Sequence, residues 1–300
     1  RLIIRWSPRR RTGWGPIVHL VELMQRLLGA ELQEIGSIGR APMRLMRRRL
    51  FRPSRSGDDI ALYLVHGPNE IASVVAHPLF DESAALRVLW IVDSFWTDRV
   101  PQGLISNFDL VIYMQEADTA YYDKVSNGRA LFIGWGADVL GLGSGQKTRP
   151  FDILRVGRQP LAWEDDQRSE GAARARGLTF HGRPPKEISY AGLMGYYAQA
   201  RFVLAFSNLV APAPYNHPTK AYFTGRWTDA LASGAVVAGI APRQDIGIAT
   251  QLWQGALLEF DGIDLERNLE TLQKASTQWH PEIARRNNLG ALMRLDWRWG

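Results

Sequence analysis

The chain has 300 residues, enough for two domains, and its 46% hydrophobic and 22% charged residues are typical of a globular protein. It contains no cysteine, which excludes disulfide bonds and cysteine-ligated metals and fits a cytoplasmic protein, and its longest nearly apolar stretch, residues 230–242, is far shorter than the ~20 residues of a membrane span. The formal net charge of +6 indicates an anionic partner such as a phosphate, an anionic lipid or a nucleic acid.

In the first half of the chain, short apolar segments alternate with helical patterns, which is typical of βαβ units. The segments expected to be buried strands are residues 2–6, 60–65, 88–92, 110–113 and 130–133. A loop over residues 7–15 follows the first strand. Pro16 then opens a helix in which Ile17, Leu20 and Val21 recur on one face.

The alternation starts again after a glycine-rich stretch, residues 141–150, which has the composition of a linker. Strands are expected at residues 153–156, 178–181, 202–206, 236–240 and 257–260, and helices at residues 164–176, 189–200, 219–233, 265–276 and 281–295. The simplest architecture is an α/β protein of two Rossmann-like domains, residues 1–143 and 144–300, that face each other across a cleft. The last helix can pack back on the N-terminal domain. Such sheets bind ligands beyond the carboxyl ends of their strands.

Residues 219–233 are the most informative segment for function. As one helix, they place Tyr222, Arg226, Asp229 and Ser233 on one side and apolar residues on the other. Arg226, near the helix N-terminus, suits a phosphate, and the carboxylate of Asp229 suits the two hydroxyl groups of a ribose. From the spacing alone, an exposed Arg226–Asp229 pair on a packing helix is the favoured alternative.

Two strand ends in the second half carry glycine beside arginine. Gly157 and Arg158 follow the first strand, where glycine allows a close approach of the backbone and arginine offers forked donors to a pyrophosphate. Gly182 and Arg183 follow the next strand, where a turn can receive a base. At Gly157 and Arg158 the alternative is a strand-end turn with a solvated arginine. At the second place an aromatic ring of the following Tyr196 or Tyr197 could lie beside the base, and the alternative is that these tyrosines are ordinary core residues.

Taken in this order, these motifs resemble the donor half of the group 1 glycosyltransferases of the GT-B fold. That family has a VGR-like strand end, an F-x-G turn and a helix with the pattern E-A-L/M-A-x-G, and residues 229–234 read DALASG. Residues 224–229, TGRWTD, are similar to the T-x-R-x-x-E of the CgeB-like, spore-maturation branch. The resemblance covers residues 152–239.

The resemblance implies an acceptor-binding N-terminal domain and a C-terminal domain that binds a nucleotide-diphosphate sugar as co-substrate, without a further cofactor. By that similarity Arg158 and Arg226 hold the diphosphate and Asp229 the ribose. The matching positions of the donor site are Gly157, Arg158, Gly182, Arg183, Lys220, Thr224, Arg226 and Asp229. The family's first acidic residue is replaced by Ala221 and its usual lysine by Trp163, so Lys220 or Arg183 must supply the second cation.

In the N-terminal half, Asp93 directly follows a strand pattern and is expected at the carboxyl end of that strand, facing the cleft. It is the candidate base that deprotonates an acceptor hydroxyl, and His66 has the same standing. A turn or capping carboxylate is the alternative for Asp93. The loop with Gly13, Trp14 and Gly15 has room for an acceptor or a donor phosphate.

No D-x-D pair and no metal-ligand spacing occurs, so no metal requirement is expected. The segment from Arg40 to Arg55 mixes arginine with apolar residues and predicts a peripheral contact with an anionic membrane, with a solvated loop as the alternative. A nucleotide-sugar epimerase on the same fold and a non-enzymatic anion or nucleic-acid binder are the rival functions. The aromatic residues do not alternate with the basic ones, so no nucleic-acid partner is expected.

Overall fold

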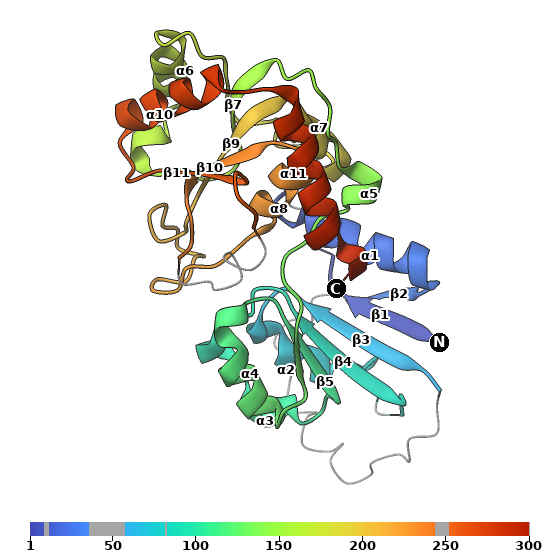
Figure 1. Ribbon diagram of the computed structural model, residues 1–300. Helices are drawn as coiled ribbons and strands as arrows, with labels where there is room; N and C mark the ends of the chain where they lie inside the picture. The colour runs from blue at the N-terminus through green and yellow to red at the C-terminus, as the bar shows by residue number, and fades with distance from the viewer. Residues whose placement is uncertain (9–11, 36–57, 82, 244–251, 300) are drawn as a thin grey trace. The chain divides into compact units, whose positions relative to one another are not determined.

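The computed structural model describes residues 1–8, 12–35, 58–81, 83–243 and 252–299 (Figure 1). The chain divides into two compact units, Arg1–Gly134 and Trp135–Gly300. The division falls after Gly134, before the glycine-rich stretch at which the sequence places the boundary. The segment from Arg40 to Arg55, with its predicted membrane contact, lies outside the described residues.

In the first unit the described residues form one parallel sheet with the strand order β2-β1-β3-β4-β5-β6. Its strands are β1 (Leu2–Trp6), β2 (Glu31–Glu34), β3 (Ile60–Val65), β4 (Leu86–Ile91), β5 (Leu110–Tyr113) and β6 (Ala130–Phe132). Its α-helices are α1 (Gly15–Leu28), α2 (Ile71–Ala76), α3 (Gln102–Ile105) and α4 (Thr119–Ser126). The predicted strands and the predicted first helix of this half are confirmed, with small shifts at their ends.

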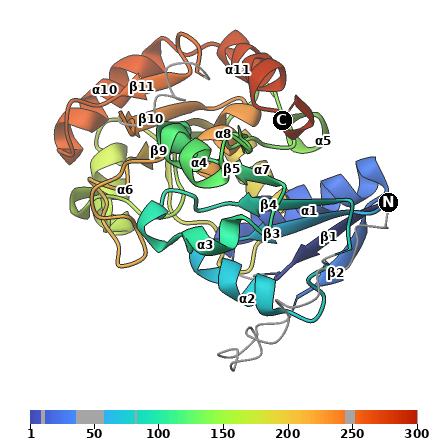
Figure 2. The ribbon, with the colours of Figure 1, turned by 90° about the horizontal axis from the view of Figure 1, so that it is seen from below.

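Helices cover both faces of this sheet, as a doubly wound topology requires. Figure 2 shows α1 and α2 on opposite faces. The side chains of α2, α3 and α4 share one core cluster with β3, β4 and β5, in which Tyr63, Phe80 and Phe108 make ring contacts. The strand β2 was not expected because its sequence, ELQE, is polar and it pairs only at the edge of the sheet.

In the second unit the described residues form a parallel sheet with the order β11-β10-β9-β7-β8. Its strands are β7 (Phe151–Arg155), β8 (Phe180–His181), β9 (Ala200–Phe206), β10 (Val236–Ile240) and β11 (Leu257–Glu259). Its α-helices are α5 (Val139–Leu142), α6 (Asp166–Arg174), α7 (Tyr190–Ala198), α8 (Gly225–Ala232), α10 (Leu265–Thr277) and α11 (Pro281–Arg294). The last helix, α11, packs on α8, α5 and β10 of its own unit.

The helix expected over residues 219–233 is shorter than predicted: α8 begins only at Gly225. In the segment before α8, backbone groups form hydrogen bonds with a side chain instead of with a helix. The amide of Asn208 donates to the carbonyls of His217 and Lys220, and its oxygen accepts from the backbone N–H of Tyr222. Such local bonds compete with helix formation. Tyr222 therefore does not share a helix face with Arg226 and Asp229.

A network of charged side chains joins the start of the second unit to its end. Ala137 pairs with Asp296 in an isolated parallel bridge. The guanidinium of Arg298 donates to both carboxylate oxygens of Asp296, at 2.8 and 2.9 Å, and to Oδ1 of Asp138, at 2.9 Å. Both carboxylates are buried, with exposed fractions of 1% for Asp138 and 3% for Asp296. One cation thus compensates two buried anions.

We therefore expect Arg298→Met to destabilise the second unit, because two buried carboxylates lose the guanidinium that they share. Removing one partner of a buried ion pair costs about 3 kcal/mol or more. The free energy of unfolding is measured by urea denaturation. The matched control is Arg267→Met, which removes an exposed arginine paired with Asp261 and should change stability far less. Equal losses in the two variants would contradict this role of Arg298.

Candidate functional site

The carboxyl end of β7 and the first turn of α8 meet at Gly157. This glycine has φ +69°, and a Cβ placed on it would lie 2.4 Å from Nη2 of Arg226. Nη1 of Arg226 donates to the carbonyl of Arg158 at 3.2 Å. The absence of a side chain at Gly157 therefore lets the guanidinium rest against the strand end. The structure brings together three residues, Gly157, Arg158 and Arg226, that the sequence assigned to one site.

Positive charge is concentrated around this turn. Burial, followed by the charges of Arg155 and Arg158, holds the pKa of the Arg226 guanidinium below its usual value. Arg155 was not singled out from the sequence, although an arginine at the end of an apolar strand can indicate a binding site. Its side chain is fully buried and forms ion pairs with Glu164, at 2.6 Å, and Asp166. An anion bound here would offset the mutual repulsion of the arginines.

Arg158 lies at the more open side of the cluster. Its guanidinium donates to the carbonyl of Pro212 at 2.5 Å and to the hydroxyl of Tyr215 at 3.0 Å. The Tyr215 ring lies 5.0 Å from the guanidinium carbon and is 67% exposed. The loop before α8 thus contacts Arg158 from the solvent side. A ligand bound at this side can replace these contacts.

The turn after β8 joins the same group of charges. Arg183 forms an ion pair with Glu164, which also pairs with Arg155. A Cβ on Gly182 would lie 3.3 Å from a carboxylate oxygen of Asp166, so a larger residue there would crowd the acidic side chain. The positions that the sequence assigned to the F-x-G turn therefore connect to the arginine cluster through two carboxylates.

Lys220 and Thr224 lie before α8 rather than inside it. The backbone N–H of Lys220 donates to Nδ1 of His217 at 3.1 Å, and its carbonyl accepts from Asn208 at 2.8 Å. Thr224 is the N-cap residue of α8, with extended backbone angles and no side-chain capping bond. Its hydroxyl is therefore available at the positive end of the helix.

Asp229 is buried on the inner side of α8, with an exposed fraction of 1%. Its Oδ1 accepts from the hydroxyl of Tyr190 at 2.6 Å. Burial raises the pKa of Asp229 to about 8, and burial together with the carboxylate raises the pKa of Tyr190 above its usual value. The alternative of an exposed Arg226–Asp229 surface pair is wrong, because Asp229 does not reach the surface. Tyr190 was not singled out from the sequence, in which only Tyr196 and Tyr197 of the same helix were considered.

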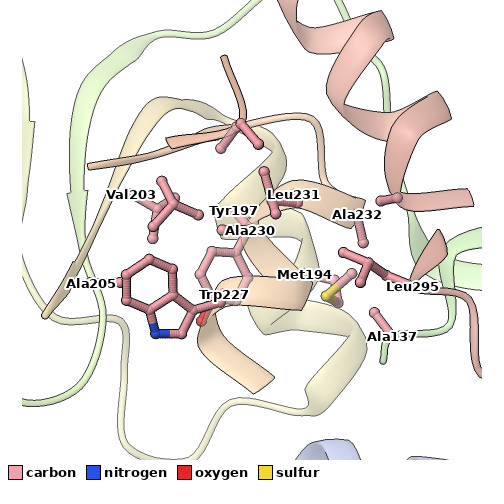
Figure 3. Close-up of a cluster of buried hydrophobic side chains, with 14 of the residues drawn as sticks. Ala137, Met194, Tyr197, Val203, Ala205, Trp227, Ala230, Leu231, Ala232 and Leu295 are labelled. Carbon is pink, nitrogen blue, oxygen red and sulfur yellow. The ribbon is translucent and has the colours of Figure 1, made fainter. Parts of the chain in front are cut away.

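The apolar side of α8 anchors these groups in the core. Figure 3 shows Trp227 and Leu231 among the side chains of Tyr197 and Val203, from α7 and β9. All of these side chains are buried. The apolar face expected from the sequence thus fixes α8 against the sheet. The polar residues of α8 are therefore held in fixed positions as well.

A second group of predicted residues meets in the first unit, at the carboxyl ends of β3 and β4. The backbone N–H of Asp93 donates to the carbonyl of His66 at 2.8 Å. The ring of Trp14 meets the ring of His66 edge-on, with centroids 4.4 Å apart. Gly13 and Gly15 flank Trp14, and Gly15 is the first residue of α1. The structure therefore gathers the loop of Gly13, Trp14 and Gly15 with His66 and Asp93 at one edge of the sheet.

Glu70 is a polar neighbour of this edge that the sequence did not reveal. Its carboxylate accepts from the backbone N–H of His66 at 2.9 Å and lies 3.3 Å from the ring nitrogen Nδ1. His66 is 1% exposed, and its Nε2 is buried without a hydrogen-bond partner. Asp93 is part-exposed. Of the two candidate bases, Asp93 is the more exposed.

No family model and no curated protein matches the chain. Among solved structures, the Anabaena protein HepE in complex with UDP aligns over 99% of this chain and 96% of its own, with a TM-score of 0.54 and 11% identity. HepE with UDP and glucose aligns over 98% and 95%, with a TM-score of 0.55 and 12% identity. Sucrose-phosphate synthase from Thermosynechococcus elongatus aligns over 100% and 96%, with a TM-score of 0.53 and 13% identity.

These similarities confirm the predicted fold class, two parallel-sheet α/β domains of the GT-B type. At 11–13% identity they show the fold alone. The expected resemblance to the CgeB-like branch stays a prediction.

The burial of Asp229 predicts a specific pH dependence of stability. With a pKa of about 8 in the folded protein against an ordinary 3.8, the native state keeps a proton that the unfolded chain releases. Stability should therefore fall as the pH rises from about 4 to 8, by up to about 1.4 kcal/mol per pH unit. Asp229→Asn keeps an oxygen acceptor for Tyr190 and cannot titrate, so its stability relative to the wild type should increase through this window.

Urea denaturation at pH 5, 6.5 and 8 measures this difference. The control is Asp261→Asn, at an exposed carboxylate, whose difference from the wild type should stay nearly constant with pH. A constant difference for Asp229→Asn as well would show that its carboxyl group has an ordinary pKa.

Proposed function

We propose that the protein is a glycosyltransferase that moves a sugar from a nucleotide-diphosphate sugar to the hydroxyl group of an acceptor. The observation that carries the proposal is the arginine cluster at the Gly157 turn, on a sheet edge where doubly wound proteins bind nucleotides. HepE, which has the same fold, was crystallised with UDP and with UDP-glucose. The acceptor is not identified by these observations.

The arginine cluster suits a diphosphate for three physical reasons. Arg158 and Arg226 offer forked N–H donors, which match phosphate oxygens in pairs. Gly157 is exposed and has no side chain, so backbone and phosphate can approach closely. The N-terminus of α8, beginning at Gly225 after Thr224, adds the positive end of a helix dipole.

We assign the ribose to the region of Asp229 and Tyr190. Because Asp229 is buried, the part-exposed phenol of Tyr190, which donates to it, is the group that meets a ribose hydroxyl. The base is assigned to the Gly182 turn, beside the rings of His181 and Tyr196, whose centroids lie 5.2 Å apart. Arg183 and Lys220 supply further positive charge for the phosphates.

In this proposal the second unit, Trp135–Gly300, binds the donor and the first unit, Arg1–Gly134, binds the acceptor. The acceptor oxygen forms a bond to the anomeric carbon as the bond to the diphosphate oxygen breaks. The nucleoside diphosphate leaves with that electron pair, and the acceptor proton passes to the carboxylate of Asp93. In a retaining reaction Asp93 would instead orient the acceptor hydroxyl.

We also propose that the arginines and the α8 terminus take the place of a metal ion at the phosphates. The described part of the chain holds no group of three or more metal-binding side chains. Turnover should therefore survive a chelator. Loss of turnover in EDTA, with recovery in manganese or magnesium, would contradict this part of the proposal.

Formation of an epimeric sugar without any acceptor would point to an epimerase instead of a transferase.

The binding experiment is a calorimetric titration with UDP, GDP, ADP and TDP. We expect at least one to bind, and Arg226→Ala to weaken that binding about 10- to 100-fold, because charge-assisted bonds to phosphate contribute about 1.5–3 kcal/mol. Arg174→Ala is the control, since it removes an exposed arginine paired with Glu170. The absence of binding by all four diphosphates at millimolar concentration would overturn the proposed function.

Asp93→Asn should lower turnover by about 10²–10⁴-fold while leaving the nucleotide affinity unchanged, because it removes a base without changing the shape of the side chain. If the enzyme retains configuration, the change should appear mainly in the KM of the acceptor. Initial rates and the anomeric configuration of the product separate these two roles. Wild-type kinetics in this variant would leave Asp93 as a turn residue that bonds the carbonyl of His66.

A further inference from the structure

The outer face of α11 (Pro281–Arg294) carries apolar side chains where a surface helix is normally polar. Its inner face is buried through Ala284, Asn287 and Ala291. On the opposite side Met293 is 79% exposed and Leu289 is 46% exposed. The two residues are four positions apart, so they lie one turn from each other on the same face. Packing within the unit therefore does not account for them.

A third exposed apolar side chain lies just beyond the end of the helix. Trp299, in the short helix η8 (Trp297–Trp299), is 61% exposed, and its ring N–H donates to the carbonyl of Leu292 at 2.5 Å. That bond holds the indole ring beside the last turn of α11. Tryptophan with its N–H bonded and its ring exposed is the side chain that prefers the boundary between water and lipid.

Arginines flank these apolar groups. Arg285 lies 4.0 Å from Glu282, with 70% of its side chain exposed. Arg286 donates to the carbonyl of Gly255 at 3.3 Å, and Arg294 donates to the carbonyl of Leu252 at 3.2 Å. Both acceptors are backbone carbonyls, and within the described residues neither guanidinium forms an ion pair. The exposed face of the helix thus combines apolar side chains with three arginines and one acidic residue, Glu282.

A surface groove of about 660 Å³ is lined by the three arginines and by Leu289 and Met293, whereas Trp299 lies outside its lining. Trp253 forms one side of it, with its ring against the helix at Gly290, where a Cβ would lie 2.5 Å from the ring. Of the charged side chains that line the groove, three are arginines and one is Glu282. The groove therefore suits a ligand that is both anionic and apolar.

We propose that this surface, defined by Arg285, Arg286, Leu289, Met293, Arg294 and Trp299, docks the protein on a bilayer of anionic phospholipid. Phosphate groups pair with the arginines, and the apolar side chains enter the boundary with the acyl chains. A helix of this length presents about 21 Å of continuous surface, which suits a bilayer better than a single small anion. No helix in the described part of the chain is long and apolar enough to cross a membrane, and the proposed contact is peripheral.

The experiment is co-sedimentation of the full chain with vesicles of phosphatidylcholine alone and of phosphatidylcholine with 30% phosphatidylglycerol. We expect binding to the anionic vesicles only. The double variant Leu289→Asp with Met293→Asp should reduce the partition coefficient at least about tenfold. The matched control is the double variant Leu161→Asp with Leu209→Asp, which adds the same two charges at side chains that are 90% and 37% exposed elsewhere on the unit, and it should reduce the partition coefficient far less.

A second arm tests the charges. Arg285→Glu should weaken binding to the anionic vesicles about fivefold or more, whereas Arg174→Glu, with the same change in net charge at an exposed arginine of α6, should weaken it less. Thermal melting confirms that the variants fold. The proposal is overturned if neither vesicle binds, if both bind equally, or if binding persists unchanged in the double variant of α11. The last result would assign membrane binding to another segment of the chain.

Discussion

The structure of the second unit depends on helix α8, which is buried on two sides. Its apolar side, with Trp227 and Leu231, fills the core between the sheet and the neighbouring helices, and its other side carries Asp229 away from solvent. A helix fixed in this way has little freedom to shift, because protein interiors are packed as densely as organic crystals. Its first turn is therefore held at a defined distance from the end of β7. The contact between Arg226 and Gly157 follows from the packing of the opposite face.

Charge is arranged around this helix in a way that stability alone does not explain. Arg155 and Asp229 are buried, and burial of ionised groups costs free energy unless partners compensate it. Arg155 is compensated by Glu164 and Asp166, whereas Asp229 has the hydroxyl of Tyr190 and a raised pKa. Arg226 keeps a lowered pKa beside two other arginines. Perturbed groups that gather at one sheet edge are typical of binding sites.

The sequence predicted the strands well, because buried parallel strands are apolar on both faces and leave a strong signal. It failed where local polar contacts decide the structure. Asn208 holds the segment before α8 out of the helix through bonds that no periodicity reveals. Glu70 reaches His66 across a turn, and the polar edge strand β2 lacks the apolar pattern on which strand prediction relies. The motif residues Gly157, Arg158 and Arg226 were found, whereas Arg155 and Tyr190 were not.

The residues that sequence patterns single out and those that the structure adds have one property in common: each breaks a local rule of folding. An arginine ends an apolar strand at Arg155, a glycine takes a left-handed conformation at Gly157, and a carboxyl group is buried at Asp229. Natural sequences agree across levels of structure except where function requires otherwise. The outer face of α11 is the reverse case, because the apolar side chain of Met293 is exposed to solvent instead of a polar group being buried. Because α11 packs directly on α8, only one helix separates that outer face from the helix that carries Arg226 and Asp229.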